Sequence, residues 1–161
     1  IPILKKLKEI LDQARIPYEV YNHALAYTAQ EIAQRQHVRG REMAKVVIVK
    51  ADQRYVMAVL PASRMLSLPR VKAALNAKEI SLATEDEFAS LFPGCEIGAM
   101  PPFGNLFGLP VYVDPALENE QVIFFNAGDH VQTVMLGYRD FKALVRPVVA
   151  LLSEERKKRA A

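Results

Sequence analysis

The sequence predicts a single α+β domain that spans residues 1–161. Its 161 residues, of which 51% are hydrophobic, suit one compact domain, because domains usually contain about 100–200 residues. Segments with the 3.6-residue period of amphipathic helices are interspersed with short runs of β-branched residues, without the regular βαβ alternation of parallel-sheet folds. No internal repeat or low-complexity segment divides the chain.

The predicted helices begin near the N-terminus, where apolar residues recur at helical spacing over residues 3–14 and Pro17 ends the pattern. Thr28, followed three residues later by Glu31, forms a capping-box pattern that opens a helix reaching about His37. Further helices are predicted at 69–75, from 84 to about 92, and from 138 onward, the last continuing into a helical tail at 146–161.

Short runs rich in β-branched and aromatic residues predict strands. They lie at 18–21, 46–49, 55–60, 111–113, 121–125 and 131–136. The runs at 46–49 and 55–60 are nearly all apolar, which predicts a hairpin with a longer loop whose two faces are both covered by other elements. The segment 98–104 is rich in glycine and proline and predicts an irregular loop.

Cysteine content and hydropathy indicate a soluble cytoplasmic protein with no membrane partner. The one cysteine, Cys95, precludes an intramolecular disulfide and a cysteine-based zinc site, which fits a reducing compartment. No apolar run reaches the ~18 residues that span a bilayer. Lysines are interleaved with apolar residues over positions 1–8, unlike the unbroken apolar run of a signal peptide.

The net charge of +3 is small, but it is unevenly distributed. Residues 1–70 carry 12 basic and 6 acidic side chains, residues 71–137 carry 2 and 9, and residues 138–161 carry 7 and 3. A mixed, solvated surface is the simpler interpretation. The alternative is a basic face that attracts nucleic-acid phosphates, with the acidic middle segment facing away. The residues expected on that face are Arg39, Arg41, Lys45 and Lys50.

The signals of common catalytic and nucleotide-binding sites are absent from the sequence. There is no phosphate-binding glycine fingerprint, paired-histidine zinc motif or Gly-x-Ser-x-Gly elbow. His23, His37 and His130 lie far apart, and such scattered histidines are more often structural than metal-binding, so no metal is predicted. Cys95 has no recognisable histidine partner and is expected to be inert rather than a nucleophile.

Five ordered motifs remain, and together they resemble a known family. They are Thr28-Ala29-Gln30-Glu31 after His23, Ala44-Lys45-Val46-Val47-Ile48-Val49-Lys50, Gly98-Ala99-Met100-Pro101-Pro102-Phe103-Gly104, Leu109-Pro110-Val111-Tyr112-Val113-Asp114 and Phe125-Asn126-Ala127-Gly128-Asp129-His130. In order and spacing these motifs resemble the YbaK and ProXp editing domains associated with prolyl-tRNA synthetase. The resemblance covers roughly residues 17–145.

The resemblance implies a mixed, partly barrel-like sheet flanked by helices. It also implies hydrolysis, without a cofactor, of the ester that joins an amino acid to the terminal adenosine of transfer RNA. The family's lysine falls on Lys45 and its Gly-x-x-x-Pro loop begins at Gly98, so these two are the expected catalytic residues. Because Pro101 and Pro102 are adjacent, the register of that loop is open by one residue. The expected substrate-binding residues are His23, Thr28, Lys50, Ala99, Met100, Pro101, Pro102, Phe103, Asn126, Gly128 and His130.

Physical chemistry supplies a role for each expected group. Ester hydrolysis places negative charge on the carbonyl oxygen, and a glycine such as Gly98 lets backbone N–H groups approach that oxygen. Lys45, at a strand end, is expected to pair with the phosphate or sugar of the terminal adenosine. No strong nucleophile is evident, so a water, the neighbouring ribose hydroxyl or a group of the substrate attacks, oriented by Asn126 and His130.

The expected substrate follows from an energetic limit. A synthetase pocket excludes an amino acid that is one methylene smaller by only ~1–3 kcal/mol, so a second hydrolytic site must remove errors. The resemblance points first to proline transfer RNA charged with alanine, cysteine or another small amino acid. Transfer RNA and prolyl-tRNA synthetase are the expected partners, and the chain is expected to be a monomer or homodimer. Two rivals are an inactive module that binds transfer RNA or the synthetase, and a hydrolase of another ester.

Overall fold

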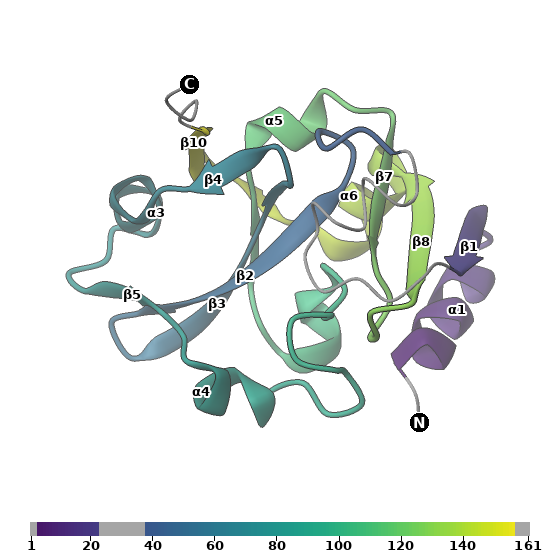
Figure 1. Ribbon diagram of the computed structural model, residues 1–161, viewed down its shortest axis with the longest axis horizontal. Coiled ribbons are helices and arrows are strands. Elements are labelled where there is room, and N and C mark those ends of the chain that lie inside the picture. Colours follow the sequence, from purple (N-terminus) through teal and green to yellow (C-terminus); the bar gives the residue numbers. More distant parts are fainter. Residues whose placement is uncertain (1–2, 23–37, 157–161) are drawn as a thin grey trace, which may run out of the picture.

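The computed structural model describes residues 3–22 and 38–156 and has the predicted α+β architecture (Figure 1). The helices are α1 (Ile3–Gln13), α3 (Leu68–Leu75), α4 (Glu85–Ala89), α5 (Pro115–Glu118) and α6 (Tyr138–Val145), with a 3-10 turn η1 (Gly104–Phe107). The strands are β1 (Tyr18–Asn22), β2 (Ala44–Ala51), β3 (Arg54–Pro61), β4 (Arg64–Leu66), β5 (Ile80–Leu82), β6 (Val111–Val113), β7 (Val122–Asn126), β8 (Gln132–Gly137), β9 (Val148–Val149) and β10 (Ser153–Glu155). The helix predicted at 28–37 lies outside the described residues. None of the helices among the described residues has the length and apolar content needed to cross a membrane.

The larger sheet has five strands in the order β5-β2-β3-β6-β9. The β3–β6 and β6–β9 pairs are parallel, and the other pairs are antiparallel. β2 and β3 form the predicted hairpin, but their loop is only Asp52 and Gln53, shorter than predicted. Asp52 adopts a left-handed φ of 58°, which a short polar side chain tolerates, and its carboxylate accepts hydrogen bonds from the N–H groups of Lys78 and Glu79.

The smaller sheet is antiparallel, in the order β1-β8-β7, and lies with α1 at the opposite end of the molecule from α3 (Figure 1). A parallel bridge between Met43 and Phe124 connects the start of β2 to β7, and the Phe124 N–H donates to the Glu42 carbonyl at 2.9 Å. A third sheet pairs β4 with β10. The partly barrel-like sheet that the resemblance implied is therefore divided into separate sheets and is not a closed barrel.

The main hydrophobic core lies between the two larger sheets. α1 contributes Leu7 and Leu11, which are fully buried, as its amphipathic pattern predicted. At the centre the ring of Phe103 lies 5.5 Å from that of Phe125 and 5.7 Å from that of Phe141, measured between centroids. Aromatic packing of this kind fixes the irregular loop that follows Gly98 against the small sheet.

A second core covers the other face of the β2–β3 hairpin. Val71 and Leu75 of α3 pack there against buried residues of both strands. α3 begins where the Ser67 side chain accepts a hydrogen bond from the Arg70 N–H, with Pro69 in its first turn. The prediction that both faces of the hairpin are covered is confirmed.

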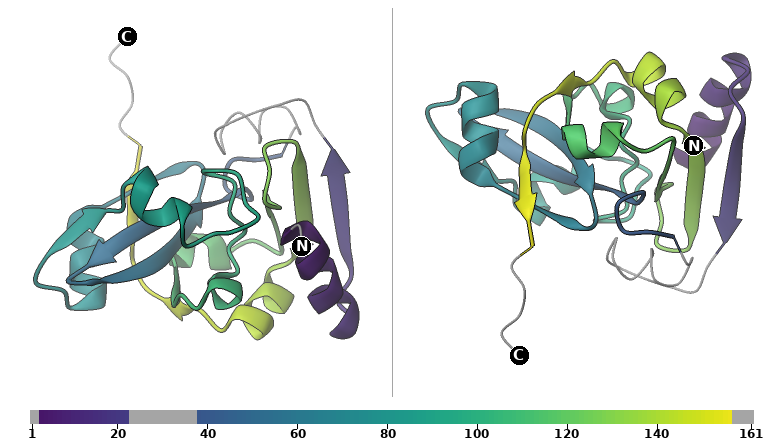
Figure 2. Two further views of the ribbon diagram at one scale, coloured as in Figure 1. Left: turned by 90° about the horizontal axis from the view of Figure 1, so that it is seen from below. Right: turned by 90° about the horizontal axis from the view of Figure 1, so that it is seen from above.

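The helical tail predicted at 146–161 is wrong for its described part, which contains β9 and β10 (Figure 2). α6 ends at Val145. Its C-cap residue, Arg146, has a left-handed φ of 52°, and Pro147 cannot continue the helix. Asp114, fully buried, holds the segment that follows. Its Oδ2 accepts hydrogen bonds from the N–H groups of Leu152 and Ser153, both at 2.9 Å, and from the Ser153 hydroxyl at 2.7 Å.

Candidate active site

Lys45 lies near the start of β2, on the face that carries the second core. It pairs across the hairpin with Leu60, and its side chain is partly buried. Burial, and to a lesser extent the nearby positive charge of Arg156, lower the pKa of Lys45 from 10.5 to about 8. A lysine with this pKa loses its charge near neutral pH far more readily than an ordinary surface lysine.

The bridge between β2 and β7 brings the strand of Asn126 beside the start of β2. Asn126 lies two residues beyond Phe124, which is bridged to Met43, and side chains two apart on a strand point to the same face. Asn126 pairs in turn with Thr133 of β8. Asn126 and Thr133 therefore lie side by side on one face of the smaller sheet.

One side-chain oxygen on each residue of this pair has no hydrogen-bond partner in the described structure. They are Asn126 Oδ1 and Thr133 Oγ1. The exposed fraction of Asn126 is 8% and that of Thr133 is 0%. Sequence reasoning selected Asn126 but missed Thr133. The available signal was a lone hydroxyl residue in the apolar run of β8, although such a residue is usually satisfied locally.

The loop containing Gly98 is joined to the loop that follows Asn126. The Gly128 N–H donates to the Ala99 carbonyl at 2.9 Å, and the Glu96 N–H donates to the Gly128 carbonyl at 2.7 Å. Gly98 itself is exposed and has a φ of +83°, a conformation that other residues rarely adopt. The N–H groups of Gly98 and Met100 donate no hydrogen bond to a protein acceptor within the described residues.

His130 closes the same pair of loops. Its Nε2 donates to the Ile97 carbonyl at 2.9 Å and lies 3.8 Å from a carboxylate oxygen of Glu96. The ring is buried, and a Cβ added to Gly98 would lie 3.8 Å from its Cε1. The structure therefore brings together Gly98, Gly128 and His130, three residues that the sequence selected from distant motifs.

The remaining residues of the predicted loop are turned inward. Ala99, Met100, Pro101, Pro102 and Phe103 are all buried. Phe103 is fully enclosed by the main core, where its side chain supports the loop. Its predicted role in substrate binding stays a prediction.

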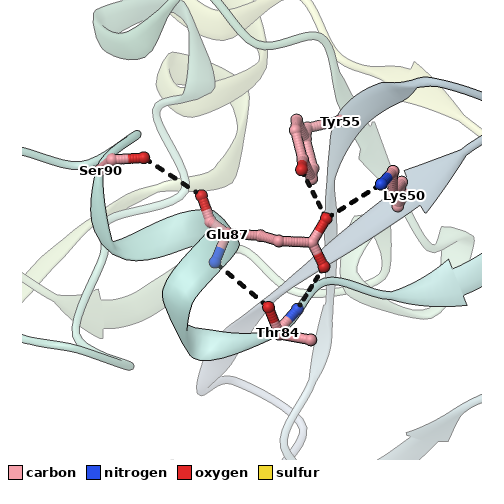
Figure 3. Close-up of polar contacts among 5 residues, drawn as sticks. All are labelled: Lys50, Tyr55, Thr84, Glu87 and Ser90. Atoms are coloured by element: carbon pink, nitrogen blue, oxygen red, sulfur yellow. Dashed lines mark hydrogen bonds and ion pairs between the residues drawn. The ribbon is translucent and has the colours of Figure 1, made fainter.

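Lys50, predicted to bind substrate, lies apart from Lys45 in the structure. It lies five residues along β2 from Lys45, roughly 16 Å away and on the opposite face. Figure 3 shows its ammonium beside one carboxylate oxygen of Glu87, at 3.2 Å, with the Tyr55 hydroxyl donating to the same oxygen at 2.5 Å. These contacts lower the pKa of Glu87 to about 2 and anchor α4, whose N-terminus is capped by Thr84. Lys50 has a structural role there.

The predicted basic face is also wrong in part. Arg41 Nε lies 3.0 Å from a carboxylate oxygen of Glu120, and Lys50 pairs with Glu87. Both carboxylates belong to the acidic middle segment, which therefore contacts the basic residues instead of facing away from them. Arg39 pairs with its near neighbour Glu42 at 3.5 Å.

Other sequence predictions concern residues at the margins of the site. His23 and Thr28, predicted to bind substrate, lie outside the described residues. Burial raises the pKa of the Cys95 thiol to about 11, so the thiolate needed for nucleophilic attack is scarce at neutral pH. Across residues 3–22 and 38–156, no cluster of three histidine, cysteine or acidic side chains is arranged to hold a metal ion.

Comparison with known proteins identifies the family. A family model described as the aminoacyl-tRNA editing domain matches residues 23–144. The multifunctional Ser/Thr-tRNA deacylase ProXp-y of Escherichia coli K12 is 26% identical over 148 residues, covering 89% of this chain and 88% of that protein. Proline–tRNA ligase of Solidesulfovibrio magneticus is 35% identical over 115 residues, covering 69% of this chain and 20% of the ligase.

The fold has solved counterparts. One structure, described as a candidate trans-editing enzyme for prolyl-tRNA synthetase, has a TM-score of 0.81 and 21% identity, covering 96% of this chain and 98% of that one. The sequence matches define the class of protein as an aminoacyl-transfer RNA editing domain. The chain belongs to the aminoacyl-tRNA editing domain family, whose model covers most of its length.

Proposed function

We propose that this chain acts in trans on mischarged transfer RNA and hydrolyses the ester of a small, wrongly attached amino acid. Proline transfer RNA carrying alanine or cysteine is the first candidate substrate, because related domains occur within proline–tRNA ligases. The name of ProXp-y adds serine and threonine to the amino acids to be tested. Prolyl-tRNA synthetase is the protein partner that this role requires, since it makes the errors to be removed.

The observation that carries this proposal is the position of Lys45. It is partly buried near the start of a strand that is bridged to β7, where the buried Asn126 Oδ1 has no hydrogen-bond partner. Its lowered pKa means that keeping a lysine here has an energetic cost. Costly polar groups gathered in one place are typical of active sites.

In the proposed mechanism Lys45 holds the phosphate or ribose of the terminal adenosine, which fixes the ester relative to the loops. The N–H groups of Gly98 and Met100 are the donors for the carbonyl oxygen as it gains negative charge, because no protein acceptor among the described residues uses them. Asn126 and His130 orient the attacking group. That group is a water, the neighbouring ribose hydroxyl or part of the substrate.

The test is single-turnover deacylation of a panel of mischarged transfer RNAs. Proline transfer RNA carrying alanine, cysteine, serine or threonine is compared with the same transfer RNA carrying proline. We expect release of at least one small amino acid and little release of proline. Lys45→Ala is expected to lose most of this activity while keeping its melting temperature. Tight binding without release of any amino acid would refute the deacylase and leave a binding module.

A further inference from the structure

Three arginines line a pocket that the mechanism above does not use. They are Arg41, Arg64 and Arg156, and the volume of the pocket, about 530 Å³, is within the range of small-ligand sites. Its walls come from the end of β3, β4, α5 and β10, and Figure 1 shows β4, α5 and β10 on the side of the molecule opposite α4. Arg156 is close enough to Lys45 to contribute to the lowered pKa of that lysine, so this arginine pocket adjoins Lys45.

Arg64 is held in place with one edge of its guanidinium still available. Its Nε donates to the Ser153 hydroxyl at 2.7 Å and its Nη2 to the Ser153 carbonyl at 3.3 Å. Ser153 is fixed in turn by the buried Asp114. Among the described residues Nη1 has no acceptor, and Arg64 forms no ion pair although Glu155 is its cross-strand neighbour. The remaining edge offers two parallel N–H donors, the arrangement that binds a phosphate through two hydrogen bonds.

The charges that line the arginine pocket favour an anion. Arg41 and Glu120 form an ion pair at 3.0 Å, so together they contribute no net charge. The other charged residues of the lining are Arg64, Arg156 and Glu155, which leave one net positive charge. An anionic group that enters the pocket therefore meets an excess of positive charge.

We propose that the arginine pocket binds the phosphate that precedes the terminal adenosine of transfer RNA. The inference rests on the proposed function for the identity of the RNA and adds the residues that hold its backbone, while Lys45 holds the terminal adenosine itself. Lys45 and Arg156 repel each other in the free protein, and a phosphate bound by Arg156 would offset that repulsion. Such contacts fix the position of the RNA without reading its bases. The 5′-terminal phosphate has the same chemistry, so the experiment distinguishes the two sources.

Arg64→Met and Arg156→Met test the proposal through the affinity of the protein for uncharged proline transfer RNA, measured by filter binding across a salt series. We expect each variant to bind about tenfold more weakly, and the plot of log affinity against log salt to become shallower by about 0.7, the value for one single-strand phosphate. Arg70→Met is the matched control, because Arg70 Nη1 donates to the same Ser153 carbonyl but does not line the pocket. It should bind as tightly as the unaltered protein.

An altered RNA locates the contact. Transfer RNA with a neutral methylphosphonate in place of the phosphate before the terminal adenosine should bind the unaltered protein about tenfold more weakly. Arg64→Met should bind this RNA and ordinary transfer RNA equally. Removal of the 5′-terminal phosphate should leave binding to the unaltered protein unchanged. A loss of affinity on removing the 5′-terminal phosphate, but not with the methylphosphonate, would assign the pocket to the 5′ end and overturn the proposal.

Unchanged affinity in both Arg64→Met and Arg156→Met, or an equal loss in Arg70→Met, would also overturn the proposal, as would failure of the unaltered protein to bind the RNA. Arg156 is exposed just after β10, so Arg156→Met keeps the test valid if Arg64→Met does not fold. Because the RNA is uncharged, these results do not depend on hydrolysis. Binding with the expected changes, but without release of any amino acid from mischarged transfer RNA, would refute the deacylase function and leave the phosphate site standing.

Discussion

Lys45→Met separates the contribution of Lys45 to function from its contribution to stability. Methionine has a similar length and fills the same space without a charge. The pKa of Lys45 falls from 10.5 to about 8 in the folded protein, and each pKa unit corresponds to about 1.4 kcal/mol. The charged lysine thus costs at most about 3.5 kcal/mol. Because solvent reaches part of the side chain, we expect Lys45→Met to raise the free energy of unfolding by about 1–2 kcal/mol at pH 7.

The pH dependence of the stability gained by Lys45→Met identifies the cause of that gain. Between pH 8 and pH 10.5 the folded protein has released the Lys45 proton while the unfolded chain still holds it. The stability of the unaltered protein therefore rises with pH across this window. The advantage of Lys45→Met should be largest below pH 8 and should disappear by about pH 10.5.

The assay is urea-induced unfolding of both proteins from pH 7 to pH 10.5, paired with single-turnover deacylation. Lys50→Met is the matched control, because it makes the same change on the same strand. The ion pair with Glu87 raises the pKa of Lys50, so this control should lose stability instead of gaining it. The reasoning is refuted if Lys45→Met destabilises the protein at pH 7, or if its gain in stability is the same at every pH.

Three further predictions concern the surroundings of the site. Gly98→Ala should lower kcat more than it changes KM, because φ of +83° strains an alanine by roughly 1–2 kcal/mol and displaces the N–H donors. Gly108→Ala, with φ of +71° at another turn, is its control, and an equal kcat for both variants would remove Gly98 from the mechanism. Asp114→Asn should lower the free energy of unfolding by about 2–4 kcal/mol in urea titration, because the amide turns an NH₂ group toward N–H donors. An unchanged midpoint of urea unfolding would contradict the role of Asp114 in holding the segment after α6. Glu87→Gln should weaken the anchoring of α4, which would be detected as faster hydrogen exchange of the α4 amides, and deacylation should persist. Loss of deacylation would instead indicate that Lys50 acts in the active site.

The sequence by itself determined the family and most of the longer helices and strands. Helical period predicted α1, and the apolar runs of β2 and β3 predicted a hairpin covered on both faces. These features are local, because propensity and periodicity act over a few neighbouring residues. Lys45, Gly98 and His130 were proposed as site residues in the same way, from short ordered motifs.

Only the tertiary structure decided which distant residues meet. The tail after α6 forms strands because Asp114, far away in the sequence, binds its backbone, and no local pattern reports such pairing. Lys50 was separated from Lys45 by the two-residue period of the strand, which sends side chains five apart to opposite faces. Thr133 was placed beside Asn126 for the same kind of reason. The register of β8 against β7 pairs the two residues, and register depends on the whole fold.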